Sequence, residues 1–294
     1  MASRNQWYQG ARPLTLPAAI SPVLLGSAIA DFHGSFKPVI ALLAMIVAVS
    51  LQVGVNYAND YSDGVRGTDK ERVGPVRLVG QGLAKPEEVK RAAFLSFGVA
   101  AIAGLLISVI TGLWILILVG LISIIAAWYY TGGKNPYGYA GFGELFVFIF
   151  FGLVAVVGTT FAQTQTIQMP EILAGVSCGA LSTAILIANN LRDIPTDQIN
   201  GKRTLAVRLG DHKTREFYKL MIVLAFLMPV IGTFNPDGPT YGYVGLFAIL
   251  SARYPLHLVQ TGKTGGELVP VLMFTGRLLL IFSVISSIAI HFSN

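Results

Sequence analysis

Four long stretches of the 294-residue chain contain no Asp, Glu, Lys or Arg. They cover residues 38–59, 92–133, 145–170 and 172–191. A helix needs about 20 apolar residues to cross the hydrocarbon core of a bilayer, and each stretch is long enough. The stretch 92–133 has room for two crossings, with Thr111-Gly112 as a turn between them. The chain is therefore predicted to be an all-α, multi-span transmembrane helical bundle.

Composition also favours a bilayer as the solvent. Hydrophobic residues make up 53% of the chain and charged residues 12%, whereas soluble domains are about 25% charged. Backbone groups in lipid must be hydrogen-bonded within the protein, which leaves helices or a closed β-barrel. The alternating pattern of a barrel is absent, so the spans are predicted to be helices. The nine predicted spans, in a single domain over residues 1–294, cover about 14–31, 38–58, 92–110, 113–131, 142–163, 171–191, 216–234, 240–257 and 268–291.

Basic residues predict the orientation of these spans. With nine spans, all but two of the 21 Lys and Arg residues lie in the N-terminal segment, in loops on the same side or, for Lys219 and Arg253, near the span ends that adjoin those loops; Lys37 and Arg277 are the exceptions. Basic loops stay in the cytoplasm, so the N-terminus is predicted to be cytoplasmic and the C-terminus external. The net charge of +6 then lies on one membrane face, where it attracts lipid headgroups or phosphates and does not indicate nucleic acid.

Two polar clusters end two of the apolar stretches, about 134 residues apart. This spacing predicts a weak internal repeat, with helices 1–4 related to helices 5–8. Side chains at i, i+4 and i+7 lie on one helix face, so Asn56, Asp60 and Asp63 are predicted to share one. Because proline disrupts a helix interior, Pro195 predicts that Asp197 lies in a turn after its helix. The clusters are Asn56, Asn59, Asp60 and Asp63, and Asn189, Asp193 and Asp197.

Oxygen ligands and nearby cations together indicate a site for a metal-bound diphosphate. Carboxylate and amide oxygens suit Mg²⁺, whose coordination shell is commonly completed by substrate phosphates. All seven cluster residues are predicted metal ligands, with Asn59 and the four aspartates as the catalytic set. Lys and Arg bind the outer phosphate oxygens. The candidates for diphosphate binding are Arg66, Lys70, Arg72, Arg77, Lys134, Lys202 and Arg203, with Arg208 nearby.

These motifs resemble those of the UbiA superfamily of intramembrane aromatic prenyltransferases. The resemblance rests on Asn59-Asp60-x-x-Asp63 and Asp193-x-x-x-Asp197, on helices 2 and 6 of nine, and on residues 201–210. It covers essentially the whole chain. In one departure, many members carry a further Asp four residues after the position of Asp63, whereas the next one here is Asp69.

Residues 56–69, 72–80 and 268–277 are similar to the menaquinone branch of that family. The resemblance implies Mg²⁺-dependent transfer of a polyprenyl group from an allylic diphosphate to 1,4-dihydroxy-2-naphthoate, with loss of CO₂ and diphosphate, giving demethylmenaquinone. It also implies a bacterial cell membrane, with lipid around the helices. Because both polar clusters end helices on the basic side, the active site is predicted to face the cytoplasm. The acceptor-binding residues are not assigned; Arg12 and Arg277 are candidates for its carboxylate.

Two alternatives stay open at this point. A different aromatic acceptor, such as 4-hydroxybenzoate or homogentisate, would use the same donor site. A cation-coupled transporter would also gather carboxylates in a helix bundle. Transporter sites lie near the bilayer midplane, whereas both clusters here are predicted to end helices on one side, and this position favours the enzyme.

Overall fold

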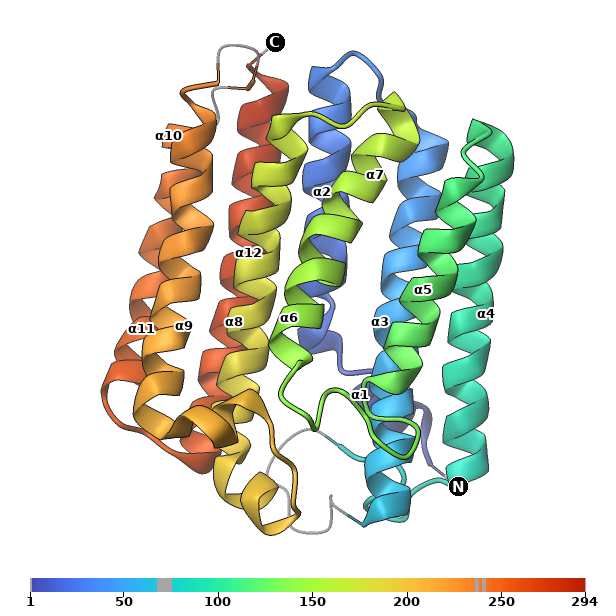
Figure 1. Cartoon of the computed structure of the whole chain (residues 1–294), viewed down its shortest axis with the longest axis vertical. Helices are drawn as coiled ribbons and strands as arrows, with labels where there is room; N and C mark the ends of the chain where they lie inside the picture. Colours follow the sequence, from blue (N-terminus) through green and yellow to red (C-terminus); the bar gives the residue numbers. More distant parts are fainter. Residues whose placement is uncertain (1, 68–75, 236–237, 240–241, 294) are drawn as a thin grey trace.

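Helices make up all the regular secondary structure in the part of the chain that the computed structural model describes, residues 2–67, 76–235, 238–239 and 242–293. Figure 1 shows the long helices side by side in one bundle, with the two chain ends at opposite ends of it. In order, the elements are α1 (Arg4–Gly10), η1 (Pro13–Thr15), α2 (Pro17–Phe32), α3 (Pro38–Arg66), α4 (Pro86–Thr111), α5 (Ile115–Tyr129), α6 (Gly143–Phe148), η2 (Ile149–Val154), α7 (Ala155–Thr164), α8 (Met169–Ile199), α9 (Leu205–Gly232), α10 (Gly242–Gly245), η3 (Leu246–Ala252), α11 (Arg253–Gln260), η4 (Gly265–Leu268) and α12 (Val269–His291).

The all-helical prediction is confirmed for these residues, but the number of membrane crossings is less sharply defined. Five segments are long and apolar enough to span a bilayer: α3, α4, α6 to α7, α8, and η4 with α12. A sixth results if the segment Arg4–Thr15 and α2, which meet at a bend of 52°, form one span. α5 is apolar but only 15 residues long. Length and hydropathy thus support five or six spans in the described chain, and the count of nine stays a prediction.

Proline and glycine set several helix ends. Pro38 and Pro86 occupy the first position of α3 and α4, where the missing N–H would have no helical partner and the fixed φ suits the helix. Gly67 and Gly112 follow the last residues of the same two helices with φ of 73°, a left-handed conformation that glycine adopts without steric cost. The turn predicted at Thr111-Gly112 is therefore confirmed.

The predicted end of the helix that carries the second polar cluster is wrong. α8 continues through Pro195 to Ile199, so Asp197 lies on the helix and not in a turn. Proline removes one backbone hydrogen bond and crowds the carbonyl four residues earlier, but near a helix end this affects a single turn. The last turn still closes, with the N–H of Asn200 donating to the Thr196 carbonyl over 3.0 Å.

α8 is the central helix of the bundle. It packs against α2, α6, η2, α7, α9 and α12, and 83% of its apolar window is buried. A helix that is apolar on all sides requires such an environment. Small residues permit the closest contact: a Cβ added to Gly152 of η2 would lie 2.4 Å from the Gly175 carbonyl oxygen and 2.5 Å from the Gly179 Cα of α8. This contact fixes the π-helical segment η2 against the helix that carries Asn189 and Asp197.

Gly152→Ala should therefore destabilise the protein. The methyl group has no room against the α8 backbone, and overpacking of this kind costs about 1–3 kcal/mol. Gly158→Ala, in the neighbouring helix α7, is the matched control because an added Cβ there meets nothing within 4 Å. Thermal unfolding in detergent should show a lower Tm for Gly152→Ala and an unchanged or higher Tm for Gly158→Ala. Equal Tm values would contradict the close approach.

Candidate active site

One large cavity joins the two polar clusters to an apolar channel. It has a volume of about 610 Å³. Its polar wall comes from the last turns of α3 and α8 and from the segments that follow them, with Asn56, Asn59, Asp63, Asn189 and Asp197 among its residues. Its apolar wall continues along the earlier part of α3 and along α4, α5 and α7. The cavity therefore has a polar site at one end of the bundle and an apolar channel beside it.

The cavity face of α3 differs from the predicted one. Asn56, Asn59 and Asp63 line the cavity, whereas Asp60 does not. At about 100° per residue, Asn59 and Asp63 lie on one side of Asn56 around the helix axis and Asp60 lies on the other. Asn56, Asp60 and Asp63 share one face of α3, as their spacing predicts, but the cavity is centred on the first side, so Asp60 lies outside it.

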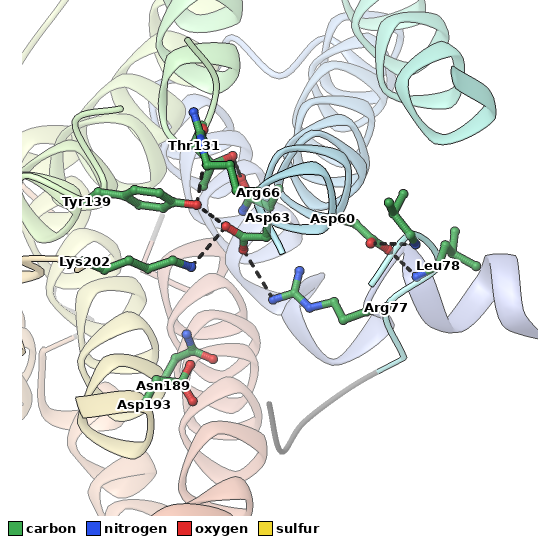
Figure 2. A network of polar contacts seen from close by, with 12 residues as sticks. Asp60, Asp63, Arg66, Arg77, Leu78, Thr131, Tyr139, Asn189, Asp193 and Lys202 are labelled. Carbon is green, nitrogen blue, oxygen red and sulfur yellow. Dashed lines mark hydrogen bonds and ion pairs between the residues drawn. The ribbon is translucent and has the colours of Figure 1, made fainter. Parts of the chain in front are cut away.

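Asp63 is the centre of a buried polar network (Figure 2). Its Oδ1 accepts hydrogen bonds from the Tyr139 hydroxyl and from Lys202 Nζ, the latter over 3.1 Å. Its Oδ2 lies 4.0 Å from Arg77 Nη2. The three partners come from the segments that follow α5, α8 and α3 respectively. We call Asp63, Arg77, Tyr139 and Lys202 the Asp63 cluster. It ties three loops to the end of one helix.

Tyr139 is held in its protonated form at this cluster. Burial and the neighbouring carboxylate of Asp63 raise the pKa of Tyr139 well above its ordinary value, because both disfavour a phenolate. The hydroxyl is therefore a hydrogen-bond donor to Asp63 at all physiological pH values. The Lys202 ammonium lies 4.5 Å from the centre of the Tyr139 ring, a cation–π distance. Tyr139 thus positions both charged partners.

Asp60 has a different environment from Asp63. It is fully buried, and its two carboxylate oxygens accept hydrogen bonds from the backbone N–H groups of Leu78 and Val79, at 2.6 and 3.1 Å. Figure 2 shows it pointing away from Asp63. These bonds fix the segment that carries Arg77, so Asp60 supports the Asp63 cluster through the chain next to it.

The second cluster divides in a similar way. Asp197 and Asn189 line the main cavity. Asp193 instead forms a two-point ion pair with Arg192, at 2.7 and 2.8 Å, and Arg192 also donates to Asn189 over 2.8 Å. Asp193 belongs to a separate small recess next to Gly265. Of the four predicted aspartates, the structure thus brings Asp63 and Asp197 to one cavity.

The predicted cationic residues also differ in position. Arg77 and Lys202 are buried at the cavity. Arg66 donates to the backbone carbonyls of Thr131 and Gly133 and so fixes the loop after α5. Lys134, Arg203 and Arg208 are exposed on the surface, and Arg277 is exposed on α12 with its guanidinium over the Phe274 ring. Lys70 and Arg72, like Asp69, lie outside the described residues.

Sequence patterns gave no signal for two residues of the site. Tyr139 contacts Asp63, and Thr131 donates to the Asn59 side chain over 2.7 Å. Both are uncharged and lie between α5 and α6, a segment without helical spacing.

Glu144, in the first turn of α6, is buried and accepts a hydrogen bond from Asn190 over 2.9 Å.

The donor set at the polar end suits a hard cation. Asp63, Asp197, Asn59 and Asn189 supply carboxylate and amide oxygens to one cavity, and Mg²⁺ favours such oxygens. Among the residues with described positions, no three His, Cys, Asp or Glu side chains are grouped closely enough to hold a metal ion. Mg²⁺ is usually held by one or two carboxylates and completed by substrate phosphates and water, so the residues present fit a metal that arrives with a diphosphate.

Comparison with known proteins identifies the class to which this fold and site belong. Residues 19–286 match the model of the UbiA prenyltransferase family, and the chain belongs to that family. It is 49% identical to the 1,4-dihydroxy-2-naphthoate octaprenyltransferase of Mycobacterium tuberculosis over 100% of this chain and 99% of the relative. It is 37% identical to the Escherichia coli protein of the same name, over 92% of this chain and 89% of the relative.

Solved structures share the fold at lower sequence identity. An apo UbiA homolog from Aeropyrum pernix K1 superposes with a TM-score of 0.70 at 14% identity, covering 92% of this chain and 96% of that one. A UbiA homolog from Archaeoglobus fulgidus bound to DMAPP and Mg²⁺ superposes with a TM-score of 0.63 at 13% identity, covering 97% and 99%.

Asp60→Asn should lower the stability of the folded protein. The substitution removes the charge from two hydrogen bonds and turns an amide N–H₂ toward a backbone N–H; a hydrogen bond to a charged group contributes about 1.5–3 kcal/mol. Thermal unfolding in detergent should show a clear fall in Tm. Glu216→Gln, at an exposed pair with Lys219, should leave Tm unchanged. An unaltered Tm in Asp60→Asn would show that Asp60 does not anchor the segment at Leu78.

Proposed function

We propose that this protein transfers a polyprenyl group from an allylic diphosphate to 1,4-dihydroxy-2-naphthoate, with Mg²⁺ as cofactor. The observation that carries the proposal is the Asp63 cluster at the polar end of an apolar cavity. We further propose that the chain forms one nine-span domain in a bacterial cell membrane, surrounded by lipid, with this polar end toward the cytoplasm. The high basic content of the segments at that end supports the orientation.

In this proposal the donor lies across the boundary between the two parts of the cavity. Lys202 and Arg77, both buried, bind the outer oxygens of the diphosphate. Asp63, Asp197, Asn59 and Asn189 would hold Mg²⁺, which would supply positive charge against the leaving diphosphate. The apolar wall along α4, α5 and α7 takes the polyprenyl chain, whose burial there is favoured by about 25 cal/mol for each Å² removed from water.

The reaction begins with cleavage of the bond between the first prenyl carbon and the diphosphate oxygen. The diphosphate leaves with the electron pair, and Lys202 and Arg77 stabilise its charge. The apolar channel keeps water away from the allylic cation that forms. The electron-rich acceptor ring then supplies the electrons for the new carbon–carbon bond, through the ring carbon that bears the carboxylate. Loss of the acceptor's carboxylate as CO₂ returns an electron pair to the ring and gives demethylmenaquinone in its reduced form.

The choice of acceptor is supported by the relatives and by the charges of the site. Relatives that match this chain over nearly their whole length are named for 1,4-dihydroxy-2-naphthoate. A carboxylated aromatic acceptor also suits a cavity with Arg12, Arg77 and Lys202 in its wall. Prenylation of 4-hydroxybenzoate or homogentisate would use the same donor site, so the assay below includes both.

Purified protein with a polyprenyl diphosphate should prenylate 1,4-dihydroxy-2-naphthoate in preference to 4-hydroxybenzoate and homogentisate. Product measured by mass spectrometry should appear with Mg²⁺ and disappear with EDTA, because the diphosphate charge is then uncompensated. Lys202→Met should raise KM for the diphosphate about 10- to 100-fold, the range for a lost charged hydrogen bond.

Lys219→Met is the matched control for Lys202→Met, since Lys219 pairs with Glu216 on the exposed face of α9. It should leave kcat and the KM for the diphosphate unchanged. Transfer that survives both EDTA and Asp63→Ala would contradict the metal-dependent mechanism. Preference for one of the other two acceptors would overturn the assigned substrate while leaving the donor site intact.

A further inference from the structure

Gln52 is a buried polar residue on the cavity wall with no part in the donor site. It lies on α3 one turn before Asn56, is 6% exposed, and lines the main cavity. It precedes Asn59 by seven residues, which is about 10 Å along a helix axis. That separation leaves room for the first carbon of the donor and one aromatic ring between Gln52 and the diphosphate end.

Hydrogen bonds of the neighbouring residues determine which way the Gln52 amide is turned. The Thr15 hydroxyl donates its only proton to the Arg12 carbonyl over 2.9 Å. Asn56 Nδ2 donates to the Ala11 carbonyl at 2.9 Å and to Thr15 Oγ1 at 3.0 Å. Backbone carbonyls only accept, so both ends of this chain of bonds are fixed.

Thr15 Oγ1 is therefore an acceptor toward the Gln52 side chain. Gln52 Nε2 donates to it over 2.8 Å and also approaches Asn56 Oδ1 at 3.4 Å. The reversed amide would place Gln52 Oε1 against Asn56 Oδ1, an oxygen–oxygen repulsion, and would draw the Thr15 proton away from Arg12. The network thus leaves Oε1 as the atom that is not engaged by these neighbours.

Gln52 Oε1 is buried and has no hydrogen-bond partner among the residues that the structure describes. A buried acceptor left unsatisfied is costly, and native proteins normally satisfy such atoms. The missing partner must be a donor, because the carbonyl oxygen of an amide only accepts. A carboxylate or a phosphate cannot serve, whereas a hydroxyl group can.

We propose that Gln52 Oε1 accepts a hydrogen bond from a ring hydroxyl of the aromatic acceptor and so fixes the orientation of the ring. The proposal rests on the proposed function. Arg12 lies beside this position in the cavity wall, and its backbone φ of 55° is unusual for a residue with a side chain. Its guanidinium also interacts electrostatically with Asp60, and it gives the acceptor's carboxylate a cation on the same side of the cavity.

This assignment makes Gln52 a specificity residue for hydroxylated acceptors. An acceptor that lacks the hydroxyl would leave Oε1 buried and unsatisfied, which weakens binding. 1,4-dihydroxy-2-naphthoate carries two hydroxyls. The analogues 1-hydroxy-2-naphthoate and 4-hydroxy-2-naphthoate each lack one of them, so they reveal which one Gln52 holds.

The test compares wild-type protein with Gln52→Leu, which keeps the size of the side chain and removes the amide. KM is measured for 1,4-dihydroxy-2-naphthoate and for the polyprenyl diphosphate, and a competitive inhibition constant for each analogue. Gln52→Leu should raise the naphthoate KM about tenfold or more and leave the diphosphate KM unchanged. The analogue that keeps the hydroxyl held by Gln52 should bind Gln52→Leu more weakly than the wild-type protein, by a similar factor. The analogue that lacks this hydroxyl should bind the two proteins equally.

Ser50→Val is the matched control, because Ser50 lies two residues away on α3 and off the part of the cavity wall that the structure describes. It should leave all four constants unchanged. An unchanged naphthoate KM in Gln52→Leu, or an equal loss of affinity for the naphthoate and both analogues, would overturn the proposal. Partial unfolding lowers kcat without changing these constants. Absence of any transfer by the wild-type protein would instead refute the proposed function.

Discussion

A single buried carboxylate, that of Asp63, organises the polar end of the molecule. It accepts hydrogen bonds from Tyr139 and Lys202 and attracts Arg77, and so joins loops that follow three different helices. Removing one partner of a buried ion pair costs about 3–5 kcal/mol, because the other charge stays buried without compensation. The loops around the cavity are therefore placed by the same charges that can bind a diphosphate.

The rest of the site follows from the division of the cavity into polar and apolar parts. α3 supplies both: apolar residues between Ala44 and Val55, and polar residues from Gln52, at its middle, to Asp63, near its end. α8, which is largely buried, holds Asn189 and Asp197 across from them. A charged diphosphate is stabilised in the polar part of the cavity, and a long apolar chain is stabilised in the apolar part. The reactive carbon, which joins the two, would therefore lie at the boundary between the parts.

Apolar stretches were enough to predict that the long helices exist but not where they end. α3 runs to Arg66, eight residues past the predicted span 38–58, and α4 begins at Pro86, six residues before the predicted span 92–110. The matched placement of the two polar clusters also indicated one shared site, and Asp63 and Asp197 do line one cavity, whereas Asp60 and Asp193 do not. The orientation of Asp60 was not, because it depends on backbone N–H groups 18 and 19 residues further along the chain. Pro195 was misjudged because a proline near the end of a well-packed helix affects only its last turns. Tyr139 has neither charge nor spacing to mark it.

In the proposed function, Asp63 and Asp197 together bind one metal ion and its diphosphate at the polar end of the cavity. Anomalous diffraction from crystals grown with Mn²⁺ and a non-hydrolysable polyprenyl diphosphate would locate that metal. We expect an anomalous peak between the side chains of Asp63 and Asp197, with diphosphate oxygens completing the shell and Lys202 in contact with them. A peak at Asp193 in the recess beside Gly265, with none at Asp63, would contradict it.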